Sequence, residues 1–167
     1  LKVVRNEKIC PRFFCLSLEA PVLLNKIQPG QFIHIKVSDG LEPFFRRPFS
    51  VYRARRHVEI LYEVVGLGTQ LLALKKPNDP LDVLGPLGNP FSLPPEGTRQ
   101  VVMIGGGIGV APFLILSDQL AGKGYQMTLL YGGRTKGHVW PMKEFKQNGC
   151  QVYVATDDGG TGMQGRV

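Results

Sequence analysis

The chain has 167 residues, of which 43% are hydrophobic and 20% are charged, and its formal net charge is +7. This length can bury a substantial core as one large or two small domains. No stretch approaches the roughly 18 apolar residues of a membrane helix, and no signal peptide is expected. Because a nucleic-acid surface would add stacking aromatics to a broad basic face, we expect neither nucleic acid nor membrane as a partner.

The first part of the chain is predicted to consist mainly of β-strands. Residues 12–18, 58–62 and 81–84 are strand-like runs, and residues 32–37 nearly alternate between apolar and polar side chains. A basic group at residues 53–57 lies between Val51-Tyr52 and the run at 58–62, which predicts a solvated hairpin tip. An acidic partner or nucleotide phosphates would account for the remaining positive charge. We predict an antiparallel β-barrel over residues 1–93.

Two motifs in this part favour binding of a diphosphate. In Arg47-Pro48-Phe49-Ser50 an arginine beside a rigid proline presents a forked donor, and the serine hydroxyl can bond a heteroaromatic nitrogen. Gly66-Leu67-Gly68-Thr69 allows a close backbone approach, and a short helix is expected to follow over residues 71–74. Taken alone, each motif is also typical of an ordinary strand end or turn.

The second part is predicted to be an α/β domain over residues 98–167, after a loop rich in Pro and Gly at residues 89–97. Strands are expected at 101–104, 126–131 and 151–155, with helices at about 111–121 and 141–148. Alternating strands and helices indicate a parallel sheet. Three strands and two helices make a thin nucleotide-binding domain, so we expect it to be incomplete at its C-terminal side.

A glycine-rich turn joins the first strand and helix of this domain. It reads Gly105-Gly106-Gly107-Ile108-Gly109-Val110-Ala111-Pro112, and Pro112 suits a first helical turn, where no N–H is needed. Such a turn brings backbone N–H groups close to a pyrophosphate. No acidic residue follows about 20 positions later to bind a ribose, and Arg134 and Lys136 could instead accept a 2′-phosphate. A purely structural turn remains the alternative.

The order of these motifs resembles the ferredoxin–NADP reductase superfamily. The likeness covers nearly the whole chain, and within the superfamily it is to the electron-transfer subunits of dihydroorotate dehydrogenase B. The segments that carry this narrower likeness are 29–32, 46–50, 62–69, 85–88 and 155–159.

The resemblance implies roles for individual residues. Arg47, with Pro48, would hold the diphosphate of FAD, Phe49 would pack against the ribityl chain or flavin, and Ser50 would lie near flavin N5 as the catalytic residue. The remaining cofactor contacts implied are to the flavin from Leu61, Tyr62 and Glu63, to the FAD pyrophosphate from Gly68 and Thr69, and to NAD from Gly106, Gly107, Gly109, Pro112, Thr156, Asp157 and Asp158. The last three residues follow a strand end, where a polar turn is equally expected.

The function implied is that of a cytoplasmic electron-transfer flavoprotein subunit in pyrimidine biosynthesis. It would pass electrons from dihydroorotate oxidation, via an iron–sulfur cluster and FAD, to NAD, together with an FMN-containing catalytic subunit in a hetero-oligomer. The [2Fe–2S] cluster is expected only beyond residue 167, because Cys10, Cys15 and Cys150 form no metal-ligand array. The alternatives are another NAD(P)H-dependent reductase of the superfamily and a non-catalytic nucleotide-binding module.

Overall fold

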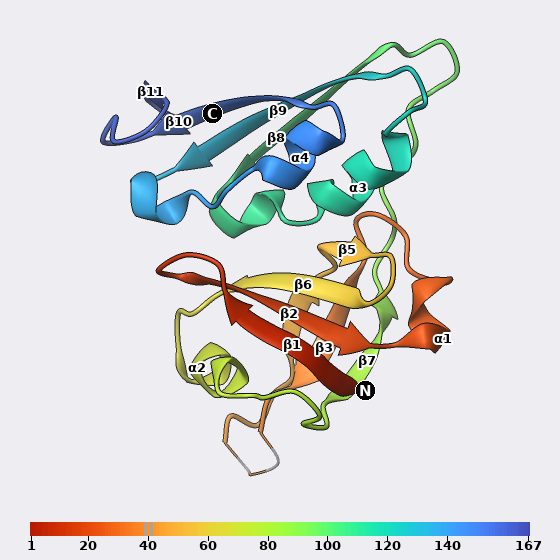
Figure 1. The fold of residues 1–167 in the computed structure, drawn as a ribbon, viewed down its shortest axis with the longest axis vertical. Coiled ribbons are helices and arrows are strands. Elements are labelled where there is room, and N and C mark those ends of the chain that lie inside the picture. The colour runs from red at the N-terminus through yellow and green to blue at the C-terminus, as the bar shows by residue number, and fades with distance from the viewer. Residues whose placement is uncertain (39, 41) are drawn as a thin grey trace. The chain divides into compact units, whose positions relative to one another are not determined.

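A computed structural model describes residues 1–38, 40 and 42–167. The chain divides into two compact units, Leu1–Phe91 and Ser92–Val167 (Figure 1). The ranges expected from the sequence, 1–93 and 98–167, stay predictions of which part binds which cofactor. None of the described helices is both long and apolar enough to cross a membrane.

The described part of the first unit contains two antiparallel sheets, as the sequence predicts. One has the strand order β1-β2-β6-β5 and the other β4-β3-β7. Two short helices, α1 (Pro21–Leu24) and α2 (Leu67–Ala73), complete the unit. The strands are β1 (Lys2–Lys8), β2 (Phe13–Glu19), β3 (Phe32–Lys36), β4 (Arg47–Ser50), β5 (Arg53–Ala54), β6 (Val58–Glu63) and β7 (Asp82–Leu87).

The chain passes from one sheet to the other directly after β4. The Val51 N–H donates to Gln31 O next to β3, in the sheet that contains β4, and the Tyr52 N–H donates to Glu59 O of β6, in the other sheet. β5 then pairs antiparallel with β6, so residues 55–57 form the expected hairpin tip. In β3 the side chains of Ile33 and Ile35 are fully buried, whereas their neighbours are only partly covered, which confirms the predicted alternation.

Asn6 of β1 joins the sheet to helix α2. Its Nδ2 donates to Leu72 O at 2.8 Å and to Lys75 O at 3.1 Å, which satisfies carbonyls at the helix C-terminus. Its Oδ1 accepts a hydrogen bond of 3.0 Å from the hydroxyl group of Tyr62 in β6. One amide therefore fixes the end of α2 against two strands.

The second unit contains a parallel sheet with the order β11-β10-β9-β8 in the described chain. Figure 1 shows the two α-helices of this unit on the same side of the sheet. The three longer strands confirm the predicted ones; the two-residue β11 was not predicted, because a glycine-rich loop offers no apolar run. The elements are β8 (Gln100–Gly106), the 3₁₀-helix η1 (Gly107–Val110), α3 (Phe113–Leu120), β9 (Gln126–Gly133), the 3₁₀-helix η2 (Lys136–His138), α4 (Lys143–Gln147), β10 (Gln151–Thr156) and β11 (Met163–Gln164).

The two faces of this parallel sheet differ in their exposure. Met103 and Leu129 are buried, whereas Val102, Ile104 and Tyr153 remain more than half exposed. Because successive side chains of a strand point to opposite faces, the exposed set lies on one face and alternates with the buried one. A parallel sheet is normally covered on both faces, so this face is unusually open.

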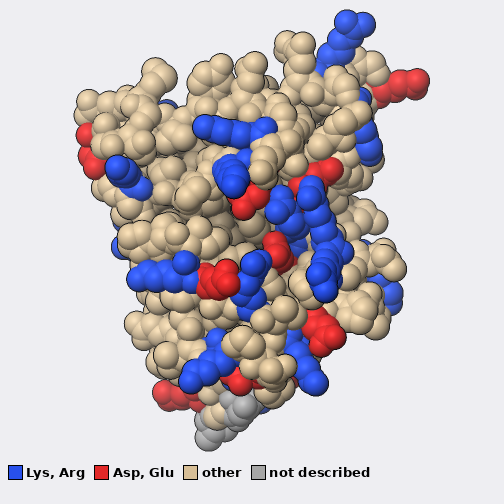
Figure 2. Space-filling model, in the orientation of Figure 1, with Lys and Arg blue, Asp and Glu red and all other residues tan. Residues whose placement is uncertain are grey.

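Charged side chains do not form one continuous basic surface on the face shown in Figure 2, where Asp and Glu lie beside Lys and Arg at many points. Part of this mixing is direct pairing. Arg5 contacts both Glu7 and Glu59, and Arg12 contacts Glu63. No broad basic stripe of the kind that tracks a nucleic-acid backbone appears in this view.

Candidate functional site

Arg47 and Gly68, which the sequence assigns to one diphosphate site, lie in contact. A Cβ atom added to Gly68 would be 3.1 Å from Arg47 Nε and 3.4 Å from its Cγ. Arg47 begins β4, and Gly68 lies in the first turn of α2. The arginine side chain therefore passes directly over the start of the helix, where a Cβ at position 68 would make a tight contact with it.

Two adjacent arginines at this point make different contacts. Arg46 donates from Nη1 to Asp82 O at 2.9 Å and forms an ion pair through Nη2 with the Asp82 carboxylate, which holds the pKa of that carboxyl below its usual range. Arg47 makes one hydrogen bond to the described residues, from Nη1 to Phe45 O at 2.5 Å. Most of the Arg47 donors therefore remain available for an anion.

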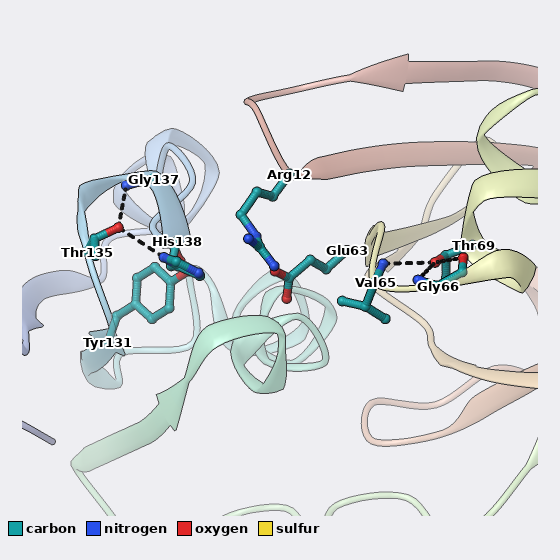
Figure 3. Close-up of polar contacts among 9 residues, drawn as sticks. All are labelled: Arg12, Glu63, Val65, Gly66, Thr69, Tyr131, Thr135, Gly137 and His138. Carbon is teal, nitrogen blue, oxygen red and sulfur yellow. Dashed lines mark hydrogen bonds and ion pairs between the residues drawn. The ribbon is translucent and has the colours of Figure 1, made fainter.

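Helix α2 begins earlier than expected, at Leu67 rather than near residue 71, so Gly68 and Thr69 lie inside it. The cause is a capping interaction that the short apolar run did not reveal. Thr69 Oγ1 accepts from the N–H groups of Val65 and Gly66 at 3.0 and 3.2 Å and donates to Gly66 O at 3.0 Å (Figure 3). The Thr69 hydroxyl is therefore occupied in shaping the turn, and its contribution to a pyrophosphate site is limited to its backbone.

The other residues of the arginine motif lie along the edge strand β4. Pro48 pairs with His34 of β3 at a position where an edge strand tolerates a missing N–H. Phe49 is 9% exposed and its ring meets Tyr62 edge-on, with the ring centroids 5.9 Å apart. Ser50 is partly exposed, and within the described part of the chain its hydroxyl has no hydrogen-bond partner, so it can bond a ligand.

The expected flavin-lining residues of β6 are mostly turned into the protein. Leu61 and Tyr62 are each 2% exposed, and burial raises the pKa of Tyr62 well above its ordinary value. The Tyr62 ring also stacks on Phe14, with centroids 5.6 Å apart. Glu63 accepts a hydrogen bond of 2.5 Å from Arg12 Nε (Figure 3). Backbone atoms of β6, rather than the Tyr62 ring, are thus what remains for a bound flavin.

In the glycine-rich turn of the second unit, one glycine is required for packing, whereas two others leave their backbone accessible. A Cβ on Gly105 would be 2.6 Å from Val110 Cγ1 and 3.2 Å from Phe113 Cε2, so this glycine lets the strand pack against the following turns. Gly107 has φ of +52°, and a Cβ on Gly107 or Gly109 would meet nothing within 4 Å. These two backbones are therefore accessible, as the sequence predicts for a phosphate turn.

Pro112 lies one residue before α3 instead of inside its first turn, because η1 takes up the preceding residues. Its φ of −67° and ψ of −10° continue the helical direction from one helix to the other. Gly106 is the last residue of β8, and a Cβ there would lie 3.7 Å from Gly132 O. Pro112 therefore shapes the turn, whereas a Cβ at Gly106 would make only an ordinary contact and one at Gly107 or Gly109 would make none.

The strand end at residues 156–158 is held by internal contacts. Thr156 is fully buried, and its hydroxyl donates to Thr161 O at 2.9 Å and accepts from Thr161 N at 3.3 Å. Asp158 Oδ1 accepts from Gly160 N at 2.9 Å, and Asp157 lies 3.4 Å from Arg166 Nε. The Thr156 side chain therefore closes a loop and does not face a ligand, whereas both aspartates remain exposed.

A polar cluster orders the loop after β9 (Figure 3). Thr135 Oγ1 lies 2.9 Å from His138 Nδ1 and accepts from Gly137 N at 3.2 Å, and the Tyr131 hydroxyl donates to His138 O at 2.9 Å. The loop also carries Lys136, which is exposed. Because the loop follows the C-terminal end of a parallel strand, it lies at the edge where α/β sheets bind ligands.

The residues present fit a diphosphate in the first unit. A forked cation crosses a glycine at which a Cβ would make a tight contact, and the hydroxyl of Ser50, which has no partner among the described residues, lies on the same strand. In the described chain no group of three or more His, Cys, Asp or Glu side chains could hold a metal ion. Sequence reasoning missed the buried role of Gly105 and the link through Asn6, for which a single asparagine gives no signal.

No family model matches the chain. Curated relatives match it over its whole length. The dihydroorotate dehydrogenase B (NAD(+)) electron transfer subunit of Geobacillus thermodenitrificans is 41% identical over 172 residues, which covers 100% of this chain and 66% of that protein. Its counterpart in Desulforamulus reducens is 36% identical over 169 residues, covering 99% of this chain and 64% of that protein. The chain thus spans only part of these relatives.

Solved structures share the fold. The structure of an NADH-dependent reduced ferredoxin-NADP oxidoreductase matches with a TM-score of 0.83 at 32% identity, over 98% of this chain and 59% of that one. The ferredoxin-NADP⁺ reductase from Plasmodium falciparum matches with a TM-score of 0.76 at 15% identity, over 96% of this chain and 71% of that one. The second likeness concerns the fold alone.

The glycine turn yields a paired prediction. Gly105→Ala should destabilise the protein by roughly 1–3 kcal/mol, because the new methyl overlaps Val110. Gly109→Ala should change stability by less than about 0.5 kcal/mol, because its Cβ enters open space. Urea unfolding of both variants measures the difference. Equal destabilisation by the two substitutions would contradict the conclusion that Gly105 is closely packed and that Gly109 borders open space.

Proposed function

Because the chain belongs to the ferredoxin–NADP reductase superfamily, together with electron transfer subunits of dihydroorotate dehydrogenase B that are 36% and 41% identical to it, we propose that it forms the FAD- and NAD-binding part of such a subunit. The subunit passes electrons from dihydroorotate oxidation, via an iron–sulfur cluster and FAD, to NAD. The observation that carries this proposal is the passage of Arg47 over Gly68, which joins the two motifs predicted to bind FAD.

In this proposal the first unit holds the FAD. Bound FAD supplies reversible two-electron chemistry, and the protein positions and tunes it. The free donors of Arg47 bind the diphosphate, and the backbone at Gly68 and Thr69 approaches it closely. Pro48 keeps the strand extended, and Phe49 supports it from the core side through its contact with Tyr62.

Ser50 is the proposed catalytic residue of this unit. It follows Phe49 in β4, its hydroxyl is partly exposed, and that hydroxyl has no partner in the described chain. A hydroxyl of this kind can donate to a ring nitrogen or accept from it without first breaking a bond within the protein. We assign it the hydrogen bond to flavin N5, with the backbone of Leu61, Tyr62 and Glu63 lining the ring.

The second unit is proposed to bind NAD at its glycine turn. The backbones of Gly106, Gly107 and Gly109 face the pyrophosphate, while Pro112 fixes the shape of the turn. Asp157 and Asp158 are exposed after the end of β10 and are available to ribose hydroxyls. Thr156 supports these two aspartates by closing the loop beneath them.

The proposed assembly includes parts that lie outside this chain. An FMN-containing catalytic subunit oxidises dihydroorotate, and the two kinds of subunit form a hetero-oligomer. The [2Fe–2S] cluster belongs to the portion of the subunit by which the relatives are longer. Cys15 and Cys150 are buried and Cys10 is partly covered, and no metal-binding group includes them in the described chain.

Replacing each of the two adjacent arginines tests the flavin site. Arg47→Ala should weaken FAD binding by roughly 10- to 150-fold, because it removes charge-assisted hydrogen bonds. Arg46→Ala is the matched control, because it removes the neighbouring charge and, with it, only surface contacts to Asp82. Flavin fluorescence titration of the apoprotein measures both affinities. An unchanged affinity after Arg47→Ala, or an equal loss in both variants, would refute the assignment.

A second test concerns the choice of nicotinamide cofactor. We expect NADH to reduce the bound flavin faster than NADPH, in line with the NAD(+) in the names of the relatives. Arg134 and Lys136 are the residues that would bind the 2′-phosphate of NADPH. Stopped-flow reduction of the full-length protein by each cofactor compares the rates. Faster reduction by NADPH would instead favour a different reductase of the superfamily.

A further inference from the structure

Strand β6 carries an arginine–glutamate pair near each of its ends. At its start, Arg5 Nη2 lies 3.2 Å from Glu59 Oε1, and at its end Arg12 Nε lies 2.5 Å from Glu63 Oε1. The two pairs match in exposure, because the arginine side chains are 49% and 46% exposed and the glutamate side chains 17% and 18%. Any difference between their roles must therefore come from what surrounds each carboxylate.

The two carboxylates differ in their partners. Glu59 Oε1 also accepts a hydrogen bond of 3.3 Å from the hydroxyl group of Ser17. The Glu63 carboxylate, by contrast, is bonded by Arg12 alone among the residues that the structure describes. Loss of Arg12 would therefore leave a mostly covered carboxylate without a compensating group, which is an unfavourable state for a charge.

Arg12 lies in the turn between β1 and β2, and this turn fixes its position. The Phe13 N–H donates to Cys10 O at 3.2 Å, and the Ile9 N–H donates to Phe13 O at 2.9 Å, which closes the turn. The Val64 N–H, directly after β6, donates to Arg12 O at 3.0 Å. Arg12 therefore holds the end of β6 through its backbone as well as through its side chain.

The strand end that Arg12 holds leads into the proposed diphosphate site. Thr69 Oγ1 accepts hydrogen bonds from the N–H groups of Val65 and Gly66, just after this strand end (Figure 3). Arg12 and Thr69 thus fix the segment from its two ends. The Glu63 carboxylate therefore keeps a defined position relative to a ligand on the backbone of β6.

We infer that Arg12 is a positioning residue that tunes the bound flavin, because its ion pair holds and neutralises the Glu63 carboxylate beside the ring. This inference rests on the proposed lining of the flavin by the end of β6. Reduced flavin is more negative than oxidised flavin, so a nearby carboxylate disfavours the reduced form and a nearby cation favours it. With both side chains present, the net charge of the pair is zero and neither form is favoured.

The midpoint potential of FAD bound to the full-length protein tests this inference, measured by spectroelectrochemical titration. Arg12→Ala should make the potential more negative, equivalent to a roughly two- to fivefold loss of affinity for reduced relative to oxidised FAD, as for unit charges that water screens. Glu63→Gln should shift the potential similarly in the positive direction, because the amide oxygen still accepts from Arg12 but carries no charge. The double variant, which is again neutral, should return to the wild-type value.

Two further variants separate charge from shape. Arg12→Lys keeps the cation and should keep the wild-type potential. Arg5→Ala is the matched control, because it opens the pair of equal exposure at the other end of β6. It should shift the potential much less than Arg12→Ala, because Glu59 lies about 13 Å from Glu63 along the strand, beyond the screening length of about 10 Å at 0.1 M salt.

The outcomes separate this inference from the proposed function. Unchanged potentials in Arg12→Ala and Glu63→Gln, with FAD still bound through Arg47, would overturn the inference and leave the flavin site in place. A double variant that keeps the full shift of Arg12→Ala, or an equal shift in Arg5→Ala, would also overturn it. If Arg12→Ala does not fold, Glu63→Gln decides, and a negative or absent shift contradicts the inference. Wild-type protein that binds no FAD would refute both proposals.

Discussion

The contact between the Arg47 side chain and the backbone of Gly68 is the constraint on which the proposed flavin site depends. A Cβ at position 68 would lie 3.1 Å from Arg47 Nε, so glycine gives the arginine side chain room to cross the helix start without a shift. The contact joins an edge strand of one sheet to the first turn of a helix. It thereby brings a forked cation and a closely approachable backbone to one point, the combination that a diphosphate requires.

Other interactions hold the two sides of this contact. Thr69 caps the start of α2 through three hydrogen bonds to the backbone at Val65 and Gly66, and Asn6 binds carbonyls at its end. Tyr62 links Asn6 to the sheet, where its ring also supports Phe49. Residues that resembled cofactor ligands in the sequence thus include several whose side chains serve to position the site.

The two adjacent arginines make different interactions because their surroundings differ. Arg46 is held by Asp82 of β7, so its charge is neutralised at the sheet edge. Arg47 faces the helix and retains free donors. The glycines of the second unit also differ in their surroundings. Neighbouring side chains occupy the space where a Cβ of Gly105 would lie, whereas the corresponding space at Gly107 and Gly109 is empty.

Much of the architecture could be predicted from periodicity and turn residues. Alternation around Ile33 and Ile35 marked a strand of the first unit, and the apolar run before Gly105 marked the first strand of the parallel sheet. The start of α2 could not be placed, because capping by Thr69 depends on a three-dimensional turn rather than on an apolar run. The inward orientation of Tyr62 and Thr156 was equally hidden, because the motif pattern alone does not show which of its side chains face the interior.

The most direct test of the central claim is nuclear magnetic resonance of ¹⁵N-labelled full-length apoprotein during titration with FAD. The account predicts that the Arg47 Nε–H and Gly68 N–H signals shift together at stoichiometric FAD. The Arg46 Nε–H signal, held by Asp82, should move little. Shifts confined to Gly107 and Gly109, with Arg47 and Gly68 unchanged, would contradict the account, because they would place the flavin in the second unit.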